Sequence, residues 1–239
     1  MQELKKLNAE IVDEHYYKDA KWFRENATRY DNYDRKGPKV FAGEYAAQSV
    51  ATVSPENKNT WECAFSEAAF MTGLERNAEV VHLTSYAPLM AHSEAWQWTP
   101  DMIWFNNLET YGTANYYVQK LFANNKGTDL LSITKDGKAL TGQNDLFASA
   151  VKDTNTKELI VKIVNTSAKV QNIIIDLKGS KLQATGTVIT LTSPSLEDEN
   201  SFAWPRKISP TESKYVLKSE KAQLSLPVYS VTILKLKMR

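Results

Sequence analysis

The stretch Gly37-Pro-Lys-Val-Phe-Ala-Gly-Glu-Tyr-Ala-Ala47 is a short apolar run that stops on a carboxylate. Pro38 favours an extended start, and Val40 to Ala42 have the character of a strand buried on both faces. Glu44 follows at the point where this strand should end. Because the chemistry of parallel α/β barrels sits at the carboxyl ends of the strands, Glu44 is the first candidate for a functional residue. The alternative is a solvated glutamate at a strand terminus.

Short apolar runs alternate with helical patterns on both sides of this strand. We predict two further strands at 11–17 and 79–86, and three helices at 19–30, 59–78 and 114–124. Strand and helix in alternation are typical of parallel β/α units, so residues 1–127 are predicted to form an α/β domain.

From residue 128 onward the pattern changes to short strands separated by turns. The predicted strands cover 147–152, 158–165, 170–177, 184–191, 222–226 and 228–237, and a long polar loop covers 193–211. Regular short strands in this number indicate an antiparallel β-sandwich over residues 128–239. The fold class is therefore α/β plus all-β.

The α/β half is too small to stand as an ordinary parallel sheet. Three strands cannot close a barrel, and an open sheet of three buried strands leaves two bare edges and uncovered apolar surface. We therefore expect that the chain is part of something longer, that it associates with itself, or that a partner chain completes it.

Composition excludes several functional classes. Lys and Arg total 29 against 28 acidic residues, so no net field favours nucleic acid or an anionic membrane. No segment approaches the roughly 20 apolar residues of a membrane span, and residues 1–10 lack a signal-peptide core. The single Cys63 fits a buried thiol, and no metal-ligand spacing is present. The compartment is left open.

Polar and aromatic groups follow each of the three predicted strands. The first strand offers His15 and Tyr17, the second offers Glu44, and the loop beyond the third holds Trp96-Gln97-Trp98. Because the carboxyl ends of parallel strands meet at one edge, these groups should converge. Aromatic faces stack on sugar rings and polar tips read hydroxyls, so this composition favours a sugar site.

Retaining glycosidases need two carboxyl groups about 5–5.5 Å apart, and only Glu44 is well placed. Strand alternation turns Glu14 to the opposite face, and a structural role is favoured for Asp13. The other acids are expected to be solvated or surface charges: Glu62, Glu67, Glu75, Glu94 and Asp101. His82 is expected to be a hydrogen-bonded core histidine.

Several segments resemble the α-L-arabinofuranosidases of glycoside hydrolase family 51. They are Asp13-Glu-His-Tyr-Tyr17, Asn26-Ala-Thr-Arg-Tyr-Asp-Asn-Tyr-Asp34, Gly37-Pro-Lys-Val-Phe-Ala-Gly-Glu-Tyr-Ala46, Met71-Thr-Gly-Leu-Glu-Arg-Asn77, Ser85-Tyr-Ala-Pro-Leu89, Trp96-Gln-Trp-Thr-Pro-Asp-Met-Ile-Trp-Phe105, Tyr111-Gly-Thr-Ala-Asn-Tyr-Tyr-Val-Gln-Lys120 and Leu226-Pro-Val-Tyr-Ser-Val-Thr-Ile-Leu-Lys235. The resemblance runs along most of the chain, and most of these motifs are seven or more residues long.

The resemblance implies the last three β/α units of a (β/α)8 TIM barrel followed by a β-sandwich. Such enzymes remove terminal α-L-arabinofuranosyl groups from arabinan or arabinoxylan with retention, and they need no metal or organic cofactor. In that pattern Glu44 matches the nucleophile that ends the seventh barrel strand. His15 and Tyr17 match sixth-strand residues beside it, and Gln97 or Trp98 falls where the family contacts the sugar.

One part of the family pattern is missing from these residues. The family's acid/base glutamate lies in an Asn-Glu dipeptide at the end of the fourth strand, and this sequence begins near the sixth. The leading hypothesis is therefore a C-terminal fragment that carries the nucleophile without the acid/base, and the isolated chain is expected to be inactive.

Two alternatives remain open. The first is a non-catalytic carbohydrate-binding or assembly module with Phe202 and Trp204 as its platform. The second is one half of a split enzyme whose other strands come from a partner chain. The expected partners are an arabinofuranosyl-containing saccharide, the missing barrel segment or a partner chain, and, as a further alternative, other copies of this chain in a homo-oligomer.

Overall fold

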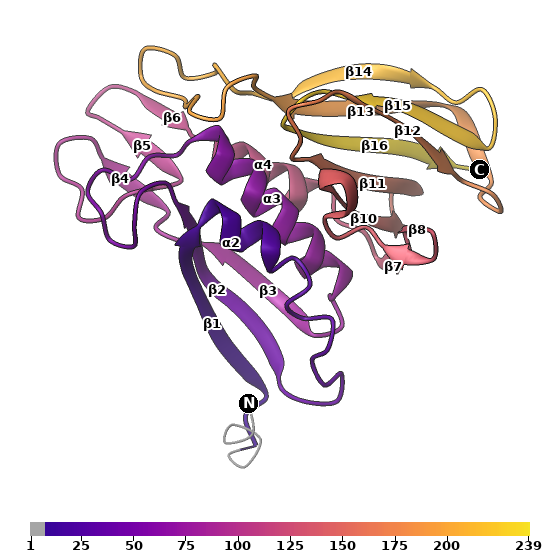
Figure 1. Ribbon diagram of the computed structural model, residues 1–239, viewed down its shortest axis with the longest axis horizontal. Coiled ribbons are helices and arrows are strands. Elements are labelled where there is room, and N and C mark those ends of the chain that lie inside the picture. The colour runs from indigo at the N-terminus through magenta and orange to yellow at the C-terminus, as the bar shows by residue number, and fades with distance from the viewer. Residues whose placement is uncertain (1–7) are drawn as a thin grey trace.

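The computed structural model describes residues 8–239, so the expectation about a signal peptide lies largely outside the described residues. A parallel sheet in the order β1-β2-β3 opens the fold, with β1 at Ile11–Asp19, β2 at Lys39–Gln48 and β3 at Val81–Tyr86. The helices α2 (Ala20–Glu25) and α3 (Trp61–Arg76) lie between this sheet and the antiparallel strands of the second half (Figure 1). The predicted parallel pairing of the three strands is confirmed.

A β-bulge interrupts β2 in the middle of the strand, which continues past the end predicted at Glu44 as far as Gln48. Asp13 of β1 pairs with Phe41, whereas His15 pairs with Glu44, so residues 42–43 of β2 together oppose one residue of β1. The register against β3 shifts over the same part of β2. A bulge re-aims the side chains that follow it, and it is a frequent device beside active sites.

The bulge decides which way Glu44 points. Val40 and Ala42 are fully buried in the core under the helices. Without the bulge, strict alternation would put Glu44 on that same face. With it, Tyr45 takes the helix-facing position, where its ring lies 6.1 Å from that of Phe70. Glu44 is thereby turned to the face that the helices leave uncovered.

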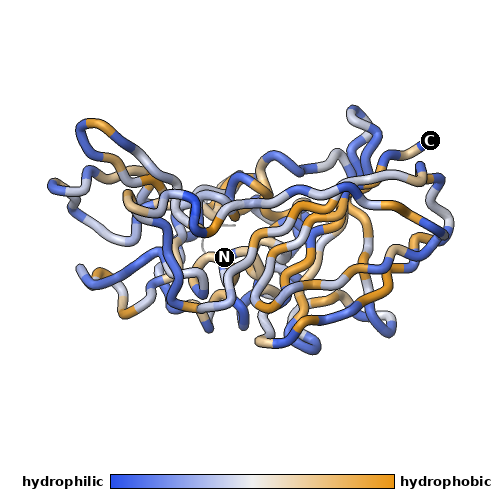
Figure 2. Tube along the Cα trace, turned by 90° about the horizontal axis from the view of Figure 1, so that it is seen from above, coloured by the Kyte–Doolittle hydropathy of each residue, from blue (hydrophilic) through white to orange (hydrophobic). Residues whose placement is uncertain are grey.

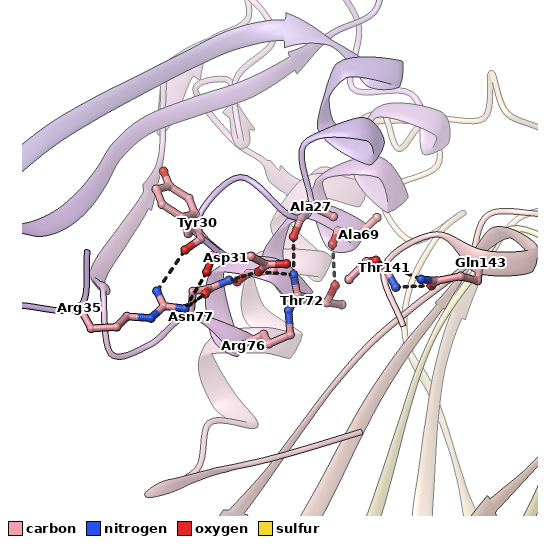
Figure 3. Close-up of polar contacts among 11 residues, drawn as sticks. Ala27, Tyr30, Asp31, Arg35, Ala69, Thr72, Arg76, Asn77, Thr141 and Gln143 are labelled. Atoms are coloured by element: carbon pink, nitrogen blue, oxygen red, sulfur yellow. Dashed lines mark hydrogen bonds and ion pairs between the residues drawn. The ribbon is translucent and has the colours of Figure 1, made fainter. Parts of the chain in front are cut away.

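The segment after α2 is held to the end of α3 by polar contacts. Arg76 donates to the Ala27 carbonyl at 2.7 Å and to Asp31 at 2.8 Å, and Asn77 donates to the same Asp31 carboxylate at 2.7 Å (Figure 3). Arg35 donates to Asn77 Oδ1 at 2.7 Å. These contacts explain why the predicted helix 19–30 is wrong in length: α2 ends at Glu25, and turns continue from there.

The predicted loop after β3 holds a small sheet of its own. The strands β4 (Met90–His92), β5 (Ile103–Phe105) and β6 (Thr110–Gly112) pair in that order. Helix α4 follows at Ala114–Asn124, with the bounds predicted from sequence. Strands of three residues are too short to show a period, which is why the sequence did not reveal them.

The second half contains the predicted antiparallel sheet. Its six strands run in the order β14-β13-β16-β11-β10-β7, with bounds Thr211–Val216, Leu182–Thr192, Ser230–Met238, Glu158–Asn165, Leu146–Asp153 and Asp129–Leu131. The pair β12 (Gln171–Asp176) and β15 (Lys221–Leu226) packs on one face of this sheet around a second apolar core. A two-stranded ribbon, β8 (Thr134–Lys135) with β9 (Lys138–Ala139), and a 3-10 turn (Gln143–Asp145) precede β10.

Apolar residues gather along the strands of this half, and hydrophilic residues lie in its loops (Figure 2). The sandwich prediction is confirmed, apart from two strands that the sequence did not predict: β7, and β14, which begins at the last residue of the predicted polar loop.

Helix α3 belongs to both halves of the fold. The same core cluster joins its apolar side chains to Val40 under the parallel sheet and to Ile160 and Ile233 of the antiparallel sheet. Trp61 donates from Nε1 to the Tyr229 carbonyl at 2.7 Å. A helix that is buried on nearly all sides fits a helix between two sheets.

The parallel sheet stays open in the described residues. Neither β1 nor β3 has a second neighbouring strand there, and Ile11 and Leu83 are 53% and 52% exposed. No helix between residues 8 and 239 is long and apolar enough to cross a membrane.

Candidate functional site

Three side chains from the adjacent strands β1 and β2 meet on the helix-free face of the parallel sheet. Tyr17 of β1 donates its hydroxyl hydrogen to Glu44 Oε2 at 2.6 Å. His15 Nδ1 lies 3.4 Å from the same carboxylate oxygen. The convergence expected for parallel neighbours is therefore present, and the bulge is what brings Glu44 into it.

Asp13 fixes the other side of the imidazole. Its Oδ2 lies 2.9 Å from His15 Nε2, while its Oδ1 accepts from the backbone N–H of Gly43 at 3.1 Å. His15 thus faces a carboxylate at each ring nitrogen, Asp13 on one side and Glu44 on the other. A structural role for Asp13, expected from the sequence, agrees with these contacts: it ties β1 to the bulge and orients the ring.

The phenol of Tyr17 remains a hydrogen-bond donor across the physiological range. Burial raises its pKa above the ordinary value, and the neighbouring Glu44 carboxylate raises it further. Glu44 itself is 44% exposed, so it is reachable from the open face. An accessible carboxylate oriented by a phenol and an imidazole can attack an electrophilic carbon or stabilise positive charge.

Glu14 points away from this group, as strand alternation predicts. Its carboxylate accepts from the hydroxyls of Tyr16, Tyr30 and Tyr33 and lies 3.4 Å from Arg29 Nε, on the helix side of β1. It is thereby excluded as the second carboxylate of a pair with Glu44.

Gln97 and Trp98 lie in the loop between β4 and β5, and both are exposed. Within residues 8–239, neither forms a hydrogen bond with His15, Tyr17 or Glu44. Their role in sugar contact stays a prediction.

The proposed sandwich platform is only partly available. Phe202 packs edge-on against Tyr111 with ring centroids 4.9 Å apart, which leaves Trp204, 70% exposed, as a single ring.

Several acids predicted to be at the surface are buried. Glu67 is fully buried and accepts from the Ala47 N–H at 2.8 Å, and Asp101 is buried with one carboxylate oxygen unpaired. Burial raises the pKa of Asp101 to about 6 and that of Glu67 to about 8. Glu75 pairs with the buried Lys162 at 2.6 Å. For Glu67, the signal that could have revealed the burial is the near-continuous apolar character of 61–74, which indicates a helix with no solvated face.

Two remaining expectations have opposite outcomes. His82 is exposed rather than a core histidine, because the outer edge of β3 carries no neighbouring strand in the described residues. Cys63 is buried, as predicted, and burial raises the pKa of its thiol to about 12. No cluster of three or more His, Cys, Asp or Glu in the described part of the chain could hold a metal ion.

Comparison with known proteins gives concordant matches. The family model described as the α-L-arabinofuranosidase C-terminal domain matches residues 43–230. An extracellular exo-α-L-arabinofuranosidase of Streptomyces chartreusis is 57% identical over 123 residues, which cover 52% of this chain and 14% of that protein. α-L-Arabinofuranosidase 1 of Arabidopsis thaliana is 36% identical over 228 residues, covering 93% of this chain and 32% of the relative.

A solved structure agrees with the sequence matches. The arabinose-bound MgGH51 α-L-arabinofuranosidase superposes with a TM-score of 0.88 at 30% identity, over 96% of this chain and 37% of that one. The matched residues thus cover between 14% and 37% of the length of these three proteins.

Proposed function

Because the chain belongs to the α-L-arabinofuranosidases of glycoside hydrolase family 51, we propose that Glu44 is the nucleophile of a retaining α-L-arabinofuranosidase. The observation that carries this proposal is the bulge in β2. It turns an accessible carboxylate in the second half of β2 away from the helices and against the Tyr17 hydroxyl at 2.6 Å. Glu44 would attack the anomeric carbon, expel the leaving group and form a covalent arabinosyl–enzyme that water then hydrolyses.

The neighbouring residues take supporting roles in this proposal. The Tyr17 phenol orients the Glu44 carboxylate and releases its hydrogen bond as negative charge moves from the carboxylate to the forming ester. His15, oriented by Asp13, lies beside Glu44 Oε2, the oxygen that also accepts from Tyr17, and helps to position it. Gln97 or Trp98 would contact the sugar from the exposed loop beyond β3.

The strands β1, β2 and β3 would be the last three β/α units of a (β/α)8 barrel. Their parallel order, the two unpaired edges and the exposed apolar side chains of Ile11 and Leu83 support this arrangement, because barrel interiors are filled by such side chains. The barrel part would cover residues 1–127 and the sandwich residues 128–239.

The acid/base carboxylate would come from strands outside these 239 residues. Neither neighbouring acid on β1 is free to pair with Glu44 across a sugar, since Glu14 faces the helices and Asp13 is engaged by His15 and Gly43. The remaining strands would be supplied by a preceding barrel segment or by a partner chain. Substrates would be saccharides with terminal α-L-arabinofuranosyl groups, such as arabinan and arabinoxylan.

Hydrolysis of an aryl α-L-arabinofuranoside tests the proposal in two formats: the folded chain alone, and the chain joined to the preceding segment of a full-length relative. The chain alone should be inactive, because general acid catalysis contributes roughly 10²–10⁴-fold and its half of the site is absent. The joined protein should be active, and Glu44→Gln should abolish turnover.

Two further variants sharpen the test. Tyr17→Phe should lower kcat by roughly 10- to 100-fold, the value of one hydrogen bond to a charged group. Glu56→Gln, an exposed acid in the loop after β2, is the matched control and should leave turnover unchanged. Turnover that survives Glu44→Gln would overturn the assignment of the nucleophile. Activity of the isolated chain that depends on Glu44 would overturn the fragment interpretation.

A further inference from the structure

A buried carboxyl group lies directly behind the strand that carries the candidate nucleophile. Glu67, on the face of α3 turned toward β2, has no solvent exposure, and its Oε1 accepts from the Ala47 N–H at 2.8 Å. Ala47 lies three residues beyond Glu44 on the same strand. The N–H of Ala47 therefore depends on Glu67 as its partner at the end of the sheet.

The second oxygen of this carboxyl group has no hydrogen-bond partner among the described residues. Glu67 Oε2 is buried and unpaired, and so is Nδ2 of Asn115, the side chain of α4 that also acts on the Glu67 carboxyl. The Asn115 amide is oriented by Asn59, which donates to its Oδ1 at 2.9 Å. An ionised Glu67 can accept from Asn115 Nδ2 through Oε2, whereas a protonated Oε2 presents a hydrogen there instead. The two protonation states thus require different contacts.

In the described part of the chain, the groups that act on the Glu67 carboxyl by hydrogen bonding are the Ala47 N–H and Asn115, and neither is a cation. Its titratable neighbours are Cys63 on α3, Tyr45 on β2 and Tyr86 on β3, and each can only become negative. Asp101, in the loop before β5, acts on the same Tyr86. With no opposing positive charge, burial dominates and raises the pKa of Glu67 to about 8.

We propose that Glu67 is a positioning residue for Glu44, which holds the carboxyl end of β2 through Ala47 in a way that depends on its own protonation. The inference rests on the proposed function of Glu44. The protonated form leaves β2 as described, with Tyr45 packed under the helices. Loss of the proton strengthens the bond to Ala47 and draws Asn115 toward Oε2, which shifts the segment from Glu44 to Ala47.

The same contacts lead on to the aromatic loop. Asn59 accepts from Trp104 Nε1 at 3.4 Å, and Trp104 lies edge-on to Trp96 with ring centroids 6.4 Å apart. A change at Glu67 can therefore reach the loop that carries Gln97 and Trp98 through Asn115 and Asn59.

The test is an NMR titration of the isotopically labelled 239-residue chain between pH 5.5 and pH 9.5. The backbone amides of Glu44, Tyr45 and Ala47 should shift together with one midpoint near 8, and the Cδ resonance of one glutamate should show the same midpoint. In Glu67→Gln, which keeps the acceptor for Ala47 but cannot ionise, this step should vanish. Glu62→Gln on the same helix, paired with Arg24 away from β2, is the control and should retain it.

Three outcomes would overturn the proposal: flat amides of Ala47 and Glu44 across this range, an Ala47 step that does not extend to Glu44, or the same midpoint in Glu67→Gln. The wild-type titration decides the matter even where the variant fails to fold. Because the readout needs no turnover, its failure is distinguishable from failure of Glu44 as nucleophile, which the arabinofuranoside assay reports.

Discussion

Removal of the negative charge opposite Lys162 should destabilise the chain strongly. The Lys162 side chain is 0% exposed, its Nζ lies 2.6 Å from Glu75 Oε1, and the ammonium also sits 5.6 Å from the Phe122 ring centroid. Ser149 donates to the other Glu75 oxygen at 2.5 Å. Glu75→Gln leaves a buried ammonium without its counter-charge, and breaking one partner of such a pair costs about 3–5 kcal/mol.

Urea unfolding followed by tryptophan fluorescence measures this cost. With an m-value of about 2 kcal/mol/M, a loss of about 4 kcal/mol moves the midpoint by roughly 2 M. Lys162→Met should cost less, because the Glu75 carboxylate left behind is 16% exposed and keeps Ser149 as a donor. The double variant should cost less than the sum of the two, since it leaves no unpaired charge.

The pH dependence of the Glu75→Gln effect has a defined sign. Burial lowers the pKa of Lys162, while Glu75 opposes the shift, so loss of Glu75 lowers this pKa further. When the pKa of Lys162 in the folded chain is depressed, burying the protonated amine lowers the free energy of unfolding. This loss is largest at pH values below the folded-state pKa. It disappears as pH rises through that pKa toward the unfolded-state pKa near 10.5. The variant should therefore be closer to wild type at pH 10 than at pH 7.

The control for these variants is an exposed pair. Lys21→Gln breaks the pair of Lys21 with Glu25 on α2, and it should change stability by less than about 0.5 kcal/mol. If Glu75→Gln changed the free energy of unfolding at pH 7 by no more than Lys21→Gln does, the view that the buried pair holds α3 to the antiparallel sheet would be refuted.

Two glycine substitutions test close packing, and one glutamate substitution tests the pH dependence of stability. Gly73→Ala should destabilise by about 1–3 kcal/mol in urea unfolding, because the new Cβ would lie 2.0 Å from the backbone oxygen of Ala27; an unchanged midpoint would contradict this close approach. Gly43→Ala should cost only about 1 kcal/mol by the same assay, since its Cβ would meet the movable Asp13 carboxylate at 2.2 Å; a loss as large as that of Gly73→Ala would show that the bulge cannot adapt. Glu67→Gln should flatten the pH dependence of stability: the raised pKa makes the wild type most stable below about 4.5 and progressively less so up to about 8. Across that window the wild type should lose roughly 4 kcal/mol of unfolding free energy relative to the variant, measured by urea unfolding at fixed pH. The same pH dependence of the unfolding free energy in both proteins would contradict a buried protonated carboxyl.

The regular elements were accessible from the sequence because their periods are long enough to read. Strand β11 and helix α4 have the predicted bounds, and the parallel order of the first three strands follows from their alternation with helices. The end of α2 was not, since residues 26–30 keep a helical pattern although the segment is held in turns by Arg76 and Asn77 at the end of a distant helix.

The meeting of His15, Tyr17 and Glu44 was predictable from parallel strand ends, yet its geometry was not. Simple alternation assigns Glu44 to the face of Val40, and only the extra residue in β2 reverses that assignment. The burial of Glu67 is not predictable from the helix alone, because a glutamate in a helix is ordinarily solvated. Local patterns carry no information about which other elements pack around a helix.

The double burial of α3 has a consequence for how such chains can be recombined. A cut at residue 127 would separate Phe65 and Trp61 from Tyr229, which directly precedes β16, and from Ile233 within β16 of the antiparallel sheet. A crossover between related genes that respects the packing would therefore fall before residue 60, in the loop ahead of α3, so that this helix is inherited together with the sheet it covers. The parallel strand that follows, β3, would travel with it and would have to pair with β2 from the other parent.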